Sequence, residues 1–312
     1  MKLVKIAAAV VLVAVLGIMS AVLFIPAKTA EFLVDVKRCL GNLEEKEIVL
    51  PSGLKYVYLE SDNTDAETLV LLHGFGADKD NFTESAPYLK DFHLIIPDHI
   101  GFGESSKPKT ADYSPTAQAK RLHALFTELN LERKIHMGGS SMGGHIAMTY
   151  AALYPAEVKS LWLLDPGGVW SAPESEMMEI IAETGVNPLT AKTESEFRDV
   201  FDMVMSEPPF VPGFVLDQMA QKRIANFDLE QNIFAQIKAD SVEERVTGME
   251  TPTLLVWGLE DRVLHHGATD VLEQLMQNVT TIKMEGIGHL PQLEAPKETA
   301  QDLKDFILLL NQ

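Results

Sequence analysis

The stretch KIHMGGSSMGGHIAMTYAALY (134–154) decides the fold, because it joins an apolar run to a helical pattern through a short glycine-rich turn. The turn holds Gly139, Ser141 and Gly143 in G-x-S-x-G spacing. A serine hydroxyl is a weak nucleophile and must be held exposed at a sharp strand-to-helix turn. Such a turn leaves room only for small residues two positions before and two positions after the serine. The stretch therefore predicts Ser141 as a nucleophile.

The neighbouring Ser140 fits this requirement less well, because Met142 lies two positions after it. The alternative is a glycine-rich turn with an incidental serine, or a phosphate-binding loop. A phosphate-binding loop is disfavoured, because the sequence contains neither G-x-x-x-x-G-K-[ST] nor G-x-G-x-x-G.

Outward from this stretch, short apolar runs alternate with helical patterns. Runs that are apolar on both faces are typical of buried strands in a parallel sheet. The alternation predicts an α/β fold with a mostly parallel, doubly wound sheet, built from residues 47–167 and 248–312. The candidate strands are 47–53, 54–61, 68–74, 92–98, 134–140, 160–165, 251–258 and 280–286, and the main candidate helices are 114–130, 142–154 and 296–310.

Residues 168–247 interrupt the alternation with a long helical tract that is rich in Met and Phe and has no strand signal. We expect a helical cap, inserted over the sheet after the sixth strand. Most of its apolar residues are expected to pack onto the core. Thioether side chains also adapt to irregular apolar ligands. Phe210 and Phe214 in PPFVPGF are candidates for a hydrophobic lip that binds substrate.

A serine nucleophile needs an imidazole base and an acid that orients it. His289 in GIGHLPQLEAP follows the last strand and precedes the final helix, which gives the chain order Ser, acid, His. Asp261 in WGLEDRV follows the preceding strand and is the first choice for the acid, with Asp165 in LLDPGG as the alternative. His265 and His266 have a lesser claim as base, and the histidines expected to serve in packing or at the surface are His93, His123, His136 and His145.

An oxyanion hole needs two backbone N–H groups directed at the developing negative charge. One is expected from Met142, the residue after the nucleophile. The other is expected from Phe75 in HGFG, just after a buried strand. Both segments end parallel strands at the same edge of the sheet, so they are expected to meet at one site.

Residues 6–25, IAAAVVLVAVLGIMSAVLFI, form an apolar run long enough to span a bilayer. A cleavable signal usually has a shorter apolar region and a small-residue cleavage site, and neither is clear here. We therefore expect a signal anchor at residues 1–30 and a juxtamembrane helix or linker at 31–46, with cleavage and secretion as the alternative. Lys2 and Lys5 precede the run, which predicts translocation of the globular part, to the periplasm in a bacterium.

Acidic residues outnumber basic ones, with 45 Asp and Glu against 26 Lys and Arg and a formal net charge of −19. Such a surface repels phosphate backbones, so nucleic-acid binding is disfavoured and neutral or cationic partners are favoured. Cys39 is the one cysteine, which excludes an intramolecular disulfide and a cysteine-rich metal site.

Taken together, six motifs resemble the α/β-hydrolase superfamily over about residues 45–312: HGFGADKDNF, DHIGFGES, GGSSMGGHIAMTYAALYP, LLDPGG, WGLEDRV and GIGHLPQLEAP. HGFGADKDNF and the apolar N-terminal run are most similar to the monoacylglycerol lipase branch, which includes bacterial lipases of the Moraxella type. The resemblance implies Ser141 as nucleophile, Asp261 and His289 as its partners, Phe75 and Met142 as oxyanion donors, and no metal or organic cofactor.

These features predict a serine hydrolase that cleaves carboxylic esters of lipids, such as monoacylglycerols, through an acyl-enzyme on Ser141. Two alternatives remain open. Carbon–carbon bond hydrolases of the meta-cleavage product type use the same triad and a similar SMGG turn, although a membrane anchor is unexpected for them. A non-catalytic binding protein of the same fold usually has a broken triad, whereas all three residue types are present here.

Overall fold

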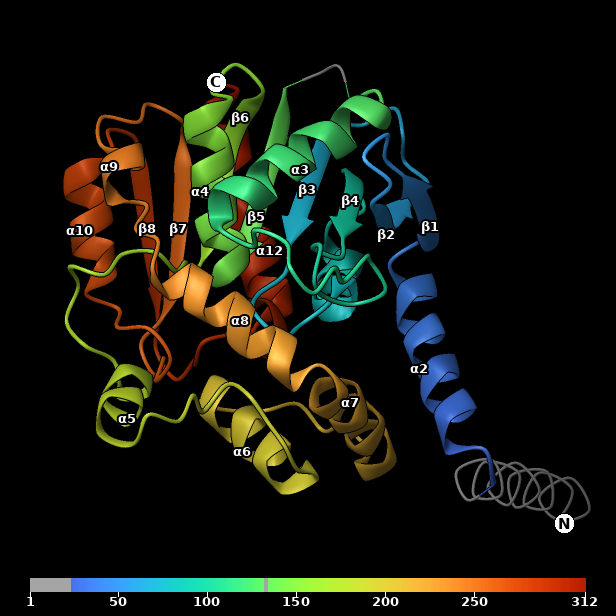
Figure 1. Ribbon diagram of the computed structural model, residues 1–312. Coiled ribbons are helices and arrows are strands. Elements are labelled where there is room, and N and C mark those ends of the chain that lie inside the picture. Colours follow the sequence, from blue (N-terminus) through green and yellow to red (C-terminus); the bar gives the residue numbers. More distant parts are fainter. Residues whose placement is uncertain (1–23, 132–133) are drawn as a thin grey trace, which may run out of the picture.

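The computed structural model describes residues 24–131 and 134–312, and within them the chain forms an eight-stranded sheet (Figure 1). The strands are β1 (Leu43–Val49), β2 (Lys55–Ser61), β3 (Thr68–Leu72), β4 (His93–Pro97), β5 (Ile135–Ser140), β6 (Val158–Leu164), β7 (Thr253–Gly258) and β8 (Val279–Met284). Their order across the sheet is β1-β2-β4-β3-β5-β6-β7-β8. The β1–β2 and β2–β4 pairs are antiparallel and the remaining neighbours are parallel, so the predicted mostly parallel sheet is confirmed.

Helices cover both faces of the sheet (Figure 1). Successive side chains of a strand point to opposite faces, and Leu71 and Leu72 of β3 accordingly belong to two different buried clusters. One face packs against α3 (Pro115–Glu128), α4 (Met142–Leu153) and α10 (Ala268–Leu275), and the other against α12 (Pro296–Leu310) and the short 3₁₀ helices η1 (Lys79–Phe82) and η2 (Ala86–Tyr88). This arrangement confirms the doubly wound architecture.

Between β6 and β7 the chain forms five helices and no strand, as expected for the cap. They are α5 (Glu176–Thr184), α6 (Glu194–Val204), α7 (Gly213–Ala225), α8 (Phe227–Lys238) and α9 (Glu243–Val246). Ser175 and Thr193 cap the N-termini of α5 and α6 through their side-chain oxygens. The helices α5 to α8 lie beyond the carboxyl ends of the parallel strands (Figure 1). Val242 N–H donates to the carbonyl of Gly168 at 2.9 Å, which ties the two ends of the insertion together.

The segment before the sheet departs from the expected boundaries. Residues Pro26–Leu40 form one helix, α2, so the helix crosses the expected boundary between an anchor ending at residue 30 and a linker at 31–46. Pro26 occupies the first turn, where its missing N–H costs nothing. β1 then begins at Leu43, inside the expected linker, because residues 43–49 pair with β2 along their full length.

Contacts of α2 with the rest of the chain fix its position. It packs against α7 of the cap, and Arg38 donates two hydrogen bonds of 2.7 Å to the carboxylate of Asp80. No helix among residues 24–131 and 134–312 has the length and apolar character needed to cross a membrane. The apolar run at 6–25 lies almost entirely outside the described residues.

Candidate active site

The turn between β5 and α4 holds Ser141 in a backbone conformation that non-glycine residues rarely adopt. Its φ is 54° and its ψ −116°. A Cβ on Gly139 would lie 2.4 Å from the carbonyl of Gly143, and one on Gly143 would lie 2.1 Å from the carbonyl oxygen of Leu72. The packing of this turn therefore requires glycine at both positions.

Ser141 is also the one residue between 135 and 151 that is not buried. Its backbone N–H donates to the carbonyl of Leu164 at 2.9 Å, and its carbonyl accepts from the N–H of Gly167 at 2.9 Å. These bonds tie the turn to the end of β6. The partly exposed serine and the fixed backbone give the strand-turn-helix geometry that a serine nucleophile needs.

Asp261 and His289 form a buried pair. Asp261 lies in the loop after β7 and His289 in the loop after β8, and His289 Nδ1 is 2.8 Å from Asp261 Oδ2. The other carboxylate oxygen of Asp261 accepts from the N–H groups of Val263 and Leu264 at 2.7 and 3.0 Å. An ionised carboxylate accepts hydrogen bonds only, so Nδ1 of His289 carries the proton and Nε2 is left free to accept one.

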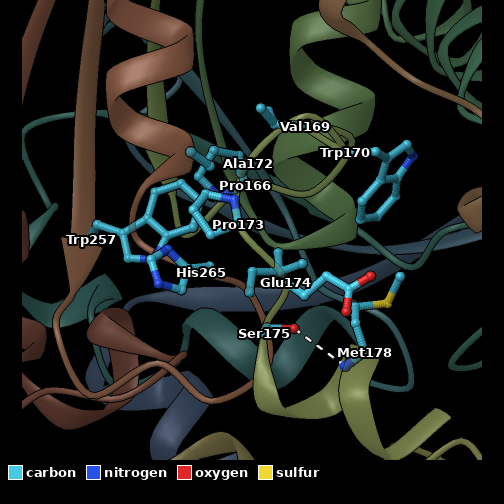
Figure 2. A pocket seen from close by; sticks show the side chains of 12 residues that line it. Pro166, Val169, Trp170, Ala172, Pro173, Glu174, Ser175, Met178, Trp257 and His265 are labelled. Atoms are coloured by element: carbon cyan, nitrogen blue, oxygen red, sulfur yellow. Dashed lines mark hydrogen bonds between the residues drawn. The ribbon is translucent and has the colours of Figure 1, made fainter. Parts of the chain in front are cut away.

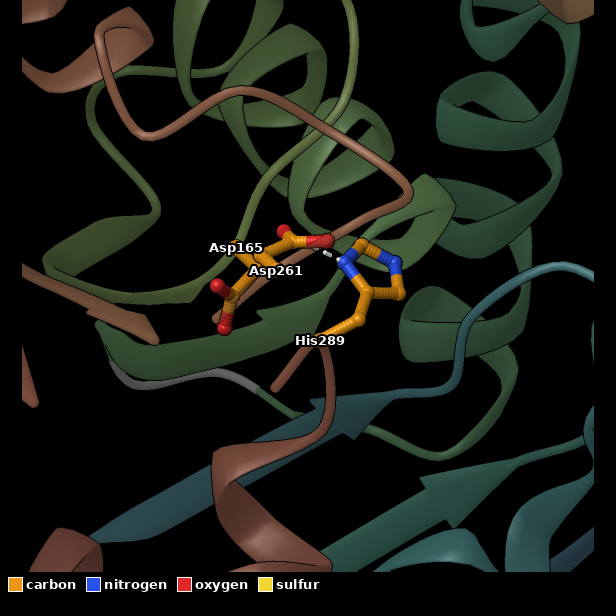
Figure 3. A group of neighbouring side chains, drawn as sticks. All are labelled: Asp165, Asp261 and His289. Carbon is orange, nitrogen blue, oxygen red and sulfur yellow. Dashed lines mark hydrogen bonds and ion pairs between the residues drawn. The ribbon is translucent and has the colours of Figure 1, made fainter. Parts of the chain in front are cut away.

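Asp165 lies beside this pair (Figure 3). It follows β6, and donor atoms of Asp165, Asp261 and His289 all lie within 4.8 Å of one another. Asp165 Oδ1 accepts from the N–H of Gly258 at 2.9 Å. Burial raises the pKa of Asp165 well above its usual value, and the negative charge of Asp261 raises it further. The imidazole N–H of His289 therefore donates to Asp261 and not to Asp165.

The HGFG loop after β3 lies against the serine turn. A Cβ on Gly74 would be 3.3 Å from the Cβ of Ser141. The conformation of the loop is supported by His73, whose Nε2 accepts from the N–H of His99 at 3.0 Å and whose Nδ1 lies 2.8 Å from the carbonyl of Gly74. Burial lowers the pKa of His73 to about 4, so its ring is neutral near pH 7. The loop that carries Phe75 and the helix that begins at Met142 therefore meet at Ser141.

Comparison with known families shows to which protein family the chain belongs. Residues 67–296 match the family described as alpha/beta hydrolase fold. The chain belongs to the α/β-hydrolase fold family. The resemblance noted in its motifs is thereby confirmed.

Three relatives illustrate what this hydrolase is similar to. Lipase 3 from Moraxella sp. (strain TA144) is 45% identical over 281 residues, which cover 89% of each chain. Monoacylglycerol lipase ABHD6 from Homo sapiens is 29% identical over 252 residues, or 77% of this chain and 75% of the relative. The crystal structure of a membrane phospholipase A, described as a novel bacterial virulence factor, superposes with a TM-score of 0.89 at 35% identity, and the match covers 100% of both chains.

Two residues of the hydrolase support the site and were missed in the sequence. Both lie in α11 (Pro291–Glu294), directly after His289. Gln292 Nε2 donates to Ser140 Oγ at 3.0 Å and to Asn81 Oδ1 at 2.9 Å. Ser140 is therefore a buried hydrogen-bond acceptor beside the nucleophile.

Glu294 joins the histidine loop to the cap. Its Oε1 accepts from the N–H groups of Gly288 and Leu290 at 3.1 and 3.4 Å, and its Oε2 accepts from those of Ser206 and Glu207 at 2.8 and 2.9 Å. One carboxylate thus satisfies four backbone donors from two segments. The only sequence signal for this role is its place in the first turn after His289.

We expect Glu294→Gln to lower kcat about 10- to 100-fold with a smaller change in KM, because an amide replaces one acceptor oxygen with a donor and lets the histidine loop shift. Steady-state kinetics on a short-chain p-nitrophenyl ester measures the effect. Glu298→Gln is the matched control, since Glu298 is exposed on α12. Equal rates for the two variants would contradict a positioning role for Glu294.

The cap contributes apolar side chains and one cation near the HGFG loop. Phe75 packs in a cluster with Met177, Met203 and Val263. Arg223 of α7 lies 5.9 Å from the centre of the Phe75 ring. Its guanidinium donates to the buried Glu230 at 2.8 Å and to the carbonyl of Leu189 at 2.6 Å. The loop that carries the expected oxyanion donor is therefore covered by the cap.

A small cavity of about 90 Å³ lies between the start of the cap and the core (Figure 2). Trp257, Leu264 and His265 line it from the core side, and residues 169–178 contribute most of the opposite wall. Phe214 is half-buried, whereas Phe210 is 91% exposed. The two lip candidates therefore differ in how far they reach into solvent.

The other histidines lie outside the group around Asp261. His136 contacts Ser160 and Glu67, and His145 Nε2 lies 2.9 Å from Asp240 Oδ1. His265 and His266 stack on each other with ring centres 4.6 Å apart. None of these rings contacts Asp261 within the described residues.

Asp165, Asp261 and His289 are also the donor types that metal ions use. Coordination there would have to break the 2.8 Å contact between His289 and Asp261 and compete with the N–H bonds of Asp261. The donor set therefore fits a hydrogen-bonded acid–imidazole pair better than a metal centre. That the protein needs no metal or organic cofactor stays a prediction.

Proposed function

We propose that this hydrolase cleaves carboxylic esters of lipids through an acyl-enzyme on Ser141. The observation that carries the proposal is the strained, partly exposed Ser141 between the HGFG loop and the end of β6, at the same sheet edge as the bonded Asp261–His289 pair. Backbone strain of this kind is concentrated at functional sites, which supports a functional role for Ser141.

In this mechanism His289 Nε2 takes the proton from Ser141 as the serine oxygen attacks the acyl carbonyl. Asp261 holds the imidazole tautomer and stabilises its positive charge. The N–H groups of Phe75 and Met142 stabilise the oxyanion. His289 then protonates the departing alcohol, and water repeats the cycle on the acyl-enzyme.

Three observations support a lipid as the substrate. The three relatives are named as a lipase, a monoacylglycerol lipase and a membrane phospholipase A. The cap places a cluster of Met, Leu and Ile side chains beside Phe75. The net charge of −19 favours neutral over anionic headgroups. We propose residues 168–247 as the cap domain, with Phe210 and Phe214 as its hydrophobic lip.

We also propose that residues 6–25 anchor the hydrolase to a membrane, with the catalytic part on the translocated side. The length and apolar character of this run support an anchor. Phe24, just before α2, and Phe32, within it, are 82% and 64% exposed, and exposed aromatic side chains there suit contact with lipid.

We expect the full chain to remain in the membrane fraction after an alkaline carbonate wash. A chain that begins at Pro26 should be soluble and active, because it keeps α2 and its contacts with α7. Fractionation followed by an esterase assay measures both. N-terminal sequencing that finds a mature chain starting after Ala21, Ala27 or Ala30 would support secretion instead.

The substrate class is tested by kcat/KM across monoacylglycerols of increasing chain length. Each methylene that enters an apolar pocket gains up to about 0.8 kcal/mol, or about fourfold in rate constant, until the pocket is full. We therefore expect specificity to rise with chain length and then fall. A zwitterionic phospholipid and a dienone acid typical of ring cleavage are assayed beside this series.

The outcomes separate the competing functions. Preference for the phospholipid would support a lipid esterase, but one with a different headgroup specificity. Preference for the dienone acid would favour the carbon–carbon bond hydrolase. A serine-reactive fluorophosphonate that fails to label Ser141 in the folded protein would favour a non-catalytic binding protein.

A further inference from the structure

Asp165 has an unusual position for a carboxyl group outside the bonded Asp261–His289 pair. Its side chain is fully buried, and its backbone has a φ of 45°, so the fold holds it in a conformation that non-glycine residues rarely adopt. Oδ1 accepts from the N–H of Gly258, but Oδ2 has no hydrogen-bond donor facing it within the described residues. A buried ionised oxygen without a donor is costly.

The groups around Asp165 increase this cost. Asp261 and Glu294 are the charged groups that act on it, and both are negative. His289, the nearby imidazole, directs Nδ1 at Asp261 instead. Two carboxylates whose oxygens lie within 4.8 Å in a buried site resist simultaneous ionisation. One proton placed on Oδ2 of Asp165 resolves both problems, because it removes a charge and gives Oδ2 a donor function.

We propose that Asp165 is a neutral carboxylic acid at pH 7 and donates its O–H to the carboxylate of Asp261. Asp165 is then a positioning residue that acts through Asp261. It holds the acid in the orientation that accepts the Nδ1 proton of His289, and it leaves a single negative charge beside the imidazole.

The resting enzyme provides a test that is independent of turnover. Infrared difference spectra of the full-length protein at pH 8, wild type minus Asp165→Asn, should contain the carbonyl band of a protonated carboxylic acid. Asp305→Asn is the matched control, because Asp305 is an exposed carboxyl on α12, and its difference spectrum should lack the band. Absence of the band in the Asp165 difference spectrum would overturn the proposal.

Stability against pH gives a second readout of the resting protein. An acid whose pKa is higher in the folded state than its usual 3.8 holds its proton more tightly when folded, so its contribution to stability falls as pH rises above 3.8. The Tm of the wild type relative to Asp165→Asn should therefore decrease between about pH 4 and pH 7. A relative Tm that increases with pH would mean that Asp165 is ionised in the folded protein.

The positioning role rests on the proposed serine mechanism and is tested by kinetics. Asparagine can donate to Asp261 and accept from Gly258, so Asp165→Asn should keep kcat within about fivefold and leave the acidic limb of the kcat/KM profile unshifted. Asp165→Ala lacks the donor and should lower kcat about tenfold or more. If Asp165→Ala does not fold, the dependence of kcat/KM on pH in Asp165→Asn still tests the proposal.

The measurements distinguish failure of the protonation, of the positioning role and of the proposed function. An ionised Asp165 in the wild type would make Asp165→Asn shift the acidic limb of the kcat/KM profile to lower pH, because a negative charge in the active site would be lost. A folded Asp165→Ala with full kcat would overturn the positioning role. If no ester is hydrolysed at all, the proposed function fails, while the infrared band still reports the protonation of Asp165.

Discussion

Ser141→Ala should lower ester hydrolysis at least about 10⁴-fold, to background, with the fold retained. Ser140→Ala should keep at least about a third of the activity. The two serines are neighbours, but only Ser141 is partly exposed, while Ser140 Oγ is buried and accepts from Gln292. Initial rates on short-chain p-nitrophenyl esters, with circular dichroism to confirm folding, measure both effects.

The Ser140 variant is a matched control, because it makes the same chemical change one residue away. Its loss of one side-chain hydrogen bond should cost about 1 kcal/mol of stability without removing the nucleophile. Equal loss of activity in both variants would show that the nucleophile has been assigned wrongly.

Asp261→Asn should lower kcat about 10³- to 10⁴-fold, the second-largest effect we expect. Its carboxylate accepts from His289 Nδ1 at 2.8 Å, and an amide in its place can offer a donor and stabilise the wrong imidazole tautomer. KM should change much less, because the loss falls on the transition state. Steady-state kinetics and a thermal melt of each variant are the measurements.

Asp165→Asn is the control for this experiment as well, since it removes the neighbouring carboxyl from the same buried group. A larger loss of kcat from Asp165→Asn than from Asp261→Asn would show that Asp165, at the end of β6, is the acid that orients the imidazole. The geometry argues against that result, because Asp165 accepts from the backbone N–H of Gly258, whereas the imidazole of His289 contacts Asp261.

The parts of the fold that local sequence determines could be predicted. The G-x-S-x-G turn requires glycine for contacts within a few residues of Ser141 and with the adjacent strand, so its spacing alone indicates the geometry. The apolar runs indicate parallel strands, because β3 to β7 are covered on both faces. Asp261 and His289 follow from chain order, and the structure brings them together.

The contacts that depend on distant segments could not be predicted. Glu294 and Gln292 are ordinary polar residues in the sequence, and their partners in the cap and near Asn81 are defined only by tertiary packing. The start of β1 was missed for a similar reason. Residues 43–49 are mostly exposed and charged, so they lack the apolar pattern of a strand and are held by pairing with β2.

The contacts of Gln292 have a consequence for the order of folding. Its side chain reaches Asn81 across 211 residues of sequence, and its carbonyl accepts from Ser85 Oγ across 207. During synthesis, β3 to β6 can pair long before α11 leaves the ribosome, but these buried polar groups stay without partners until it docks. Contacts so far apart in sequence form late, because the entropy of closing the intervening chain must be overcome first. We therefore expect the histidine loop to be among the last elements to assemble, so that a nascent or C-terminally shortened chain holds most of the sheet and yet lacks the base.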